Sequence, residues 1–152
     1  AVRSTVTGSL FLGGAVVNNV TNSFAGSFPP TGFAINNGSN TNGWALSTVG
    51  ANGTTRSARI NFYDIGAGET DDMYLPRMDF SQAGTNTELT FYVAHAQYTA
   101  ATADKLMVQA STDCGATWTT LFDKSGAPLS TRAPMSGAYS NPAAAEWRME
   151  TV

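Results

Sequence analysis

One stretch in the second half of the chain constrains the fold more than any other. Apolar side chains recur at every second position from Leu106 to Ala110, which is the period that a half-buried strand requires. Asp113 and Gly115 follow, and this pair favours a tight reversal, because Asp can bond to nearby backbone and Gly tolerates positive φ. A second apolar run begins at Trp118. The stretch therefore predicts a β-hairpin.

The composition extends this prediction to the whole chain. Only 12% of the 152 residues are charged, and the formal net charge is -3. So few charges among many Thr, Ser, Asn and Gly residues are typical of short strands joined by polar turns, and the length suits one domain. We expect an all-β fold. With 8 basic against 11 acidic residues, the chain has no basic run, which argues against nucleic acid or a membrane surface as a partner. It also has no run of about 18 apolar residues, which argues against membrane insertion.

Further strands are predicted where apolar and polar residues alternate. Pro76 places its strand at a sheet edge or bulge, because Pro cannot donate to the ladder. Residues 27–53 are rich in Pro, Gly and Asn and predict loops with short strands. The chain has no helical stripe of useful length. The predicted strands are 6–12 and 15–20 as an opening hairpin, then 59–63, 73–78, 88–96 and 147–152.

Six motifs occur in an order that resembles a known family. They are Phe28-Pro29-Pro30-Thr31-Gly32-Phe33 with Trp44, then the segments 71–81, 89–94, 111–118, 127–131 and 146–152. This order resembles the choice-of-anchor and cleaved-adhesin jelly rolls, which are MAM-like domains of secreted bacterial surface proteins. The resemblance implies an antiparallel β-sandwich of jelly-roll type over residues 22–152. Residues 1–21 are then an N-terminal β-hairpin extension.

The resemblance implies attachment rather than catalysis. We expect a non-catalytic extracellular adhesion module of a larger secreted or surface-attached protein, with a surface glycan or a protein as its ligand. The family has further strands beyond the position of Val152, so this sandwich is expected to lack its final strands. A structural subunit of an extracellular filament is the alternative, in which copies of the chain complete one another's open sheet edges.

The residues that could perform chemistry are few. His95 is the single histidine, and it lies within a strand pattern, where a hydrogen-bonded packing role is expected. Cys114 is the single cysteine, so an internal disulfide is excluded. No Gly-x-Ser-x-Gly elbow is present. We therefore expect no enzyme, and an enzyme that uses the acidic stretch from Glu69 to Asp79 is the third alternative.

The same acidic stretch contains the candidate metal ligands. Calcium takes several oxygen ligands, including backbone carbonyls, and jelly rolls of this kind often carry a structural ion. Asp71 and Asp72 are the predicted ligands. The acidic residues that precede the family's first Phe are replaced here by Asn22 and Ser23, so fewer carboxylates are available to hold the ion.

Aromatic side chains on loops are the candidate ligand-binding residues, because an exposed ring can stack on a sugar face. Trp44, Tyr74 and Tyr98 are predicted for this role. Trp118 and Trp147 are expected in the core instead.

Overall fold

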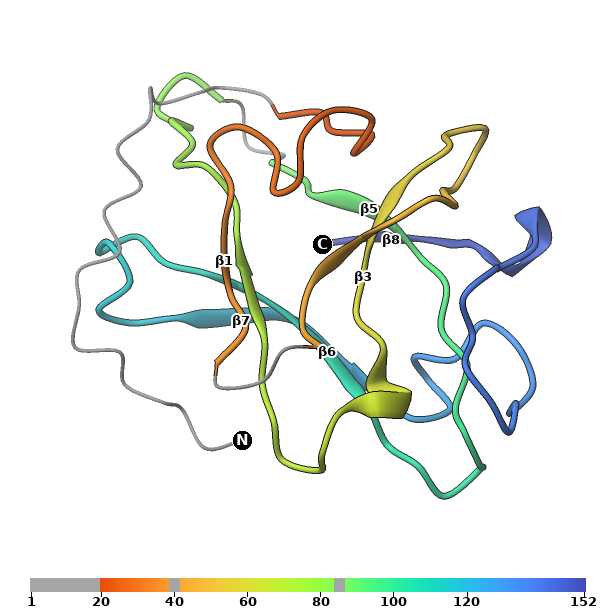
Figure 1. Ribbon diagram of the computed structural model, residues 1–152. Coiled ribbons are helices and arrows are strands. Elements are labelled where there is room, and N and C mark those ends of the chain that lie inside the picture. The colour runs from red at the N-terminus through yellow and green to blue at the C-terminus, as the bar shows by residue number, and fades with distance from the viewer. Residues whose placement is uncertain (1–19, 39–41, 84–86) are drawn as a thin grey trace. The chain divides into compact units, whose positions relative to one another are not determined.

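The computed structural model describes residues 20–38, 42–83 and 87–152 (Figure 1). In these residues strands are the main regular elements, and helix is limited to two short 3-10 turns, which confirms an all-β chain. The strands are β1 (Ala34–Asn36), β2 (Ala45–Ser47), β3 (Ser57–Arg59), β4 (Asp72–Tyr74), β5 (Thr90–Val93), β6 (Lys105–Ala110), β7 (Thr119–Ser125) and β8 (Arg148–Thr151). The 3-10 turns are η1 (Phe62–Asp64) and η2 (Ala144–Glu146).

The chain divides into two compact units, the first ending at Thr87 and the second running from Glu88 to Val152. Among the residues that the structure describes, each unit contains two antiparallel two-stranded sheets, β1–β4 and β2–β3 in the first and β5–β8 and β6–β7 in the second. The hairpin predicted within residues 1–21 lies, except for its last residues, outside the described part of the chain.

The first unit consists of short ladders joined by long loops. β1 and β4 pair in a register that sets Ile35 opposite Met73. The predicted strand over 73–78 is only partly present: β4 ends at Tyr74, before Pro76, which cannot donate to a ladder. The predicted strand over 59–63 is only partly present: β3 ends at Arg59, and η1 follows. The loops with short strands predicted over 27–53 are confirmed by β1 and β2.

The hairpin predicted around Asp113 is confirmed in the second unit as β6 and β7 (Figure 1). Cys114 and Gly115 both adopt positive φ, 59° and 87°, at its turn. The ladder contains a bulge, because Val108 pairs with Phe122 while Gln109 pairs with Thr120. The register thus skips a residue of β7 between these two pairs.

Side chains connect the two ladders of the second unit. Phe91 of β5 and Phe122 of β7 meet edge to face, with ring centroids 5.4 Å apart. Nearby, Lys124 of β7 donates to both carboxylate oxygens of Glu150 in β8 at 2.8 Å. Backbone bonds between Leu89 and Val152 extend the β5–β8 ladder by one pair. The predicted strands at 88–96 and 147–152 are therefore confirmed with tighter bounds.

The core of the described residues is small. Leu129 is 2% exposed and Phe122 is 7% exposed, while many other apolar side chains are only half-buried. Trp118 and Trp147, expected in the core, are both half-buried. Trp118 packs on its own hairpin end instead, where its indole N–H donates to the Gly115 carbonyl at 3.1 Å.

Candidate binding site

Trp44 lies where three segments of the first unit meet. Its backbone N–H donates to Asn37 Oδ1 at 2.9 Å, and its indole N–H donates to the Asp71 carbonyl at 3.1 Å. Gly43 beside it is buried, and an added Cβ there would collide with the side chains of Asn37 and Asp71. The polar atoms of Trp44 thus fix the fold of this corner, which leaves the half-buried ring for any contact with a ligand.

Tyr74 and Asp72 lie on the same side of β4, two positions apart. The Tyr74 hydroxyl donates to Asp72 Oδ2 at 3.2 Å, and Asp72 is exposed. Asp71, in contrast, is half-buried, and its side chain lies against Gly43. The neighbouring carboxylates predicted to share a metal ion therefore have different surroundings.

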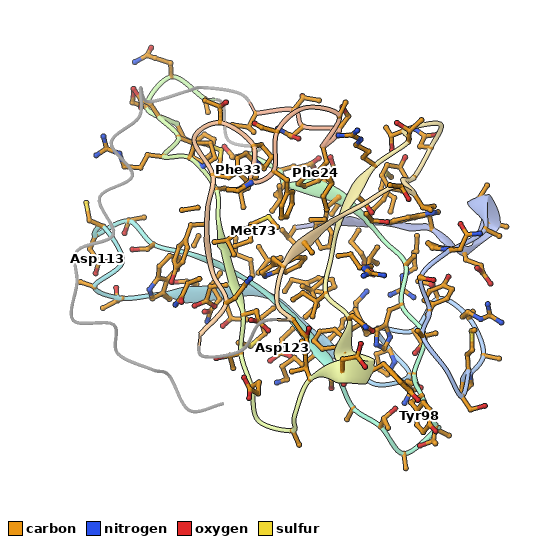
Figure 2. All side chains as sticks on the ribbon, viewed as in Figure 1. Phe24, Phe33, Met73, Tyr98, Asp113 and Asp123 are labelled. Atoms are coloured by element: carbon orange, nitrogen blue, oxygen red, sulfur yellow. The ribbon has the colours of Figure 1, made fainter. Side chains whose placement is uncertain are left out.

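Tyr98 lies in the loop between β5 and β6 and is 46% exposed (Figure 2). The loop is held from inside by Gln97, which is 4% exposed. The Gln97 side-chain amide donates to the Thr102 carbonyl, and the Gln97 carbonyl accepts from Met135 N–H at 2.8 Å. Tyr98 is thus an exposed ring on a well-bonded loop, the arrangement that a binding residue needs.

The structure adds an exposed pair that sequence reasoning did not select. Tyr92 of β5 lies directly opposite Met149 of β8, and these side chains are 43% and 58% exposed. Thr90 and Thr151 form the adjacent exposed pair, and we call these four residues the outer face of the β5–β8 ladder. The alternation of Thr90 and Tyr92 with Phe91 was the available signal, because it sets both on the face away from Phe91.

His95 is 8% exposed and connects β5 to the loop that follows β7. Its backbone N–H and carbonyl both bond to Thr131, and its Nδ1 lies 3.2 Å from Ser130 Oγ. Burial lowers the His95 pKa, with a further lowering by Arg148, although Asp104, with Oδ2 3.6 Å from Nε2, opposes this shift. His95 is therefore buried and hydrogen-bonded, which are the features expected of a packing residue.

Arg148 holds the same loop from β8. Its guanidinium donates to the carbonyls of Pro128, Leu129 and Ser130 at 3.0 to 3.1 Å. Arg148 Nε also donates to Glu150 at 2.8 Å. Burial raises the Glu150 pKa, but the hydrogen bonds from Lys124 and Arg148 outweigh it and leave the pKa below its usual value. This network lacks any local sequence signal, because its members come from separate segments.

Searches of family models, curated proteins and solved structures each found no match to this chain. In the part of the chain that the structure describes, no helix is long and apolar enough to cross a membrane. Among the same residues, no three His, Cys, Asp or Glu side chains gather into a group that could hold a metal ion.

Proposed function

We propose that this chain is a non-catalytic extracellular binding module of jelly-roll type, which attaches a larger secreted surface protein to a glycan or a protein. The observation that carries the proposal is the exposure of tyrosine rings on well-bonded backbone. Tyr92 lies on a paired strand and Tyr98 on a loop held by Gln97, and each ring is more than two-fifths exposed. Rings held in this way stack on sugar or protein surfaces at a low cost in conformational entropy.

Tyr98 is the first of the predicted binding residues to test. Trp44 and Tyr74 use polar atoms in bonds within their own unit and would contribute their ring faces. Tyr98 has the ring that a ligand reaches most easily, because it projects from a loop and is 46% exposed. The burial of His95 also favours binding over catalysis, because the residue is 8% exposed, its ring lies against Ser130 and its backbone bonds to Thr131.

The experiment is a binding screen of the intact chain against arrays of surface glycans and extracellular proteins. On a ligand found there, Tyr98→Ala is expected to weaken binding roughly 2- to 12-fold, the worth of one aromatic stacking contact. Tyr98→Phe keeps the ring and should bind like the original chain. Tyr63→Ala removes another exposed tyrosine, 58% exposed in the first unit, and serves as the matched control. Equal losses in Tyr98→Ala and Tyr63→Ala would contradict a specific role for Tyr98.

A structural calcium ion is part of the proposal through Asp71 and Asp72. Asp71 is the better-placed ligand, because its side chain and the Asn37 amide oxygen both lie beside Gly43. Calcium would be bound by these oxygens together with backbone carbonyls and water. Addition of calcium should then raise the thermal midpoint of the chain, and Asp71→Asn should remove more of that rise than Asp72→Asn.

Self-assembly is a second candidate, and the outer face of the β5–β8 ladder favours it. Each sheet of the described residues has only two strands, so backbone donors and acceptors remain at its edges, and the Tyr92–Met149 pair is exposed beside them. Such edges pair readily with strands of other chains. Sedimentation velocity and electron microscopy test this candidate. The chain is a filament subunit if it forms fibres and if Tyr92→Lys and Met149→Lys abolish them. A chain that stays monomeric at high concentration would contradict self-assembly.

A further inference from the structure

The loop over residues 22–31 of the first unit forms a small hollow. Five of the described residues line it, and the hollow has a volume of about 220 Å³. This is smaller than the roughly 300 to 1,000 Å³ of pockets that take drug-sized ligands, so it fits one small ring. The lining residues are Asn22, Gly26, Ser27, Pro30 and Thr31.

The loop around the hollow is held by its own hydrogen bonds. Asn22 Oδ1 accepts from the Phe24 N–H at 2.7 Å, and the Pro30 carbonyl accepts from the Phe33 N–H at 2.9 Å. From outside the loop, Arg56 donates to the carbonyl of Gly26 at 3.4 Å. Bonds of this kind preorganise a site and reduce the entropy lost on binding.

Aromatic rings interleave with the lining residues and pack together. The centroid of Phe24 lies 6.3 Å from that of Phe28 and 6.5 Å from that of Phe33, where the rings meet edge to face. Figure 2 labels Phe24 and Phe33 in this cluster. The phenylalanines thus give the loop a small apolar core of its own, which supports the hollow.

The lining chemistry selects the ligand. Asn22, Ser27 and Thr31 offer an amide and two hydroxyls, which donate and accept hydrogen bonds. Pro30 is buried and adds an apolar surface, and none of the five lining residues carries a charge. A neutral ring with hydroxyls at its rim and C–H groups on its face matches this combination.

We propose that the hollow is a binding subsite for a single neutral sugar ring, free or at the end of a glycan. This inference rests on the proposed binding function and gives it a ligand class and a place. A hexose has about a dozen non-hydrogen atoms. At a modest binding free energy per atom, its dissociation constant in the hollow is on the order of 1 mM.

Gly26 provides the sharpest variant. Gly26 is one of the lining residues, a Cβ added there meets no atom within 4 Å, and its φ is not positive, so a larger side chain can be introduced at the wall of the hollow without strain. Gly66 is the matched control in the same unit, because its φ is not positive either, and its added Cβ stays 3.9 Å from Glu69. Thr31→Val is the second variant, because it removes one exposed hydroxyl and keeps the side-chain shape.

The test is a titration of the intact ¹⁵N-labelled chain with glucose, galactose, mannose and N-acetylglucosamine, followed by amide chemical shifts. We expect saturable shifts at Asn22, Ser27 and Thr31 with at least one sugar. Gly26→Val should weaken that binding about tenfold or more, Thr31→Val should weaken it severalfold, and Gly66→Val should leave it unchanged.

Other results would overturn the inference: no saturable shift with any of the four sugars, shifts confined to other segments, or unchanged affinity in Gly26→Val. Tighter binding of glucuronic acid than of glucose would overturn the assignment to a neutral ring. An oligosaccharide that ends in the same sugar distinguishes the two ligands. If it binds with the same affinity and the same shifts, the natural ligand is the end of a glycan. If only the monosaccharide binds, the natural ligand is the free sugar. If the chain binds a surface ligand through Tyr98 while the hollow binds no sugar, the sugar subsite is refuted and the proposed function is retained. If the hollow takes sugar but the array screen finds no surface ligand, the adhesion role fails instead.

Discussion

Truncation of Leu129 is expected to destabilise the chain more than truncation of any exposed leucine. Leu129 is 2% exposed and lies in the loop that Arg148 holds, whereas Leu121 in β7 is 50% exposed. A buried Leu→Ala substitution costs about 2 to 5 kcal/mol, from lost transfer free energy and the cavity left behind. We expect about 3 kcal/mol for Leu129→Ala. Leu121→Ala is the same chemical change at the surface and should cost less than about 1 kcal/mol.

Urea unfolding followed by tryptophan fluorescence measures both free energies. With a slope near 1.5 kcal/mol per molar urea, Leu129→Ala should lower the midpoint by about 2 M without a change of slope. A loss below about 1 kcal/mol for Leu129→Ala would refute the core assigned here. A loss for Leu121→Ala as large as that for Leu129→Ala would refute it as well.

Three further predictions concern single residues. Burial lowers the His95 pKa, so the unfolded chain binds a proton more readily than the folded chain. The free energy of unfolding should therefore fall as the pH drops below about 6.5. In urea titrations, His95→Gln should remove this pH dependence. Gly43→Ala should destabilise the first unit and increase the exposure of its tryptophan to a fluorescence quencher, because the new methyl group collides with Asn37 and Asp71; an unchanged midpoint would contradict this packing. Hydrogen bonds from Thr117 and Ser111 lower the pKa of Asp113 to about 2. The contribution of Asp113 to the stability of the hairpin is therefore complete above pH 4 and should be lost between about pH 4 and 2. Asp113→Asn should abolish this transition in amide spectra.

The strands of the second unit could be predicted from the sequence because their signals are local. The alternation from Leu106 to Ala110 and the Asp113 turn together specify β6, β7 and their reversal. The pattern around Phe91 likewise predicts both the buried and the exposed side of β5. The predicted ends of these strands were less accurate. The strand predicted to reach residue 96 stops at Val93, because the buried His95 bonds to a loop instead of a neighbouring strand.

The candidate sites could be predicted only in part, because they depend on contacts between distant segments. The position of Trp44 against Asp71 joins residues 27 apart in the chain, and the loop held by Arg148 joins residues about 20 apart. Neither pair carries a local pattern. The hollow beside Pro30 depends on backbone geometry, since small residues leave it open and bonds within the loop hold its shape. Tyr98 was predictable as a loop aromatic, although the Gln97 contacts beneath it were not.

We propose that the chain binds an external surface and leaves it chemically unchanged. The most direct measurement is a saturation binding assay of the intact chain on its array-selected ligand, with the ligand recovered afterwards and weighed by mass spectrometry. We predict saturable binding that Tyr98→Ala weakens and Tyr98→Phe preserves, with a ligand of unaltered mass. Cleavage or modification of the recovered ligand, or binding that is indifferent to Tyr98, would contradict it.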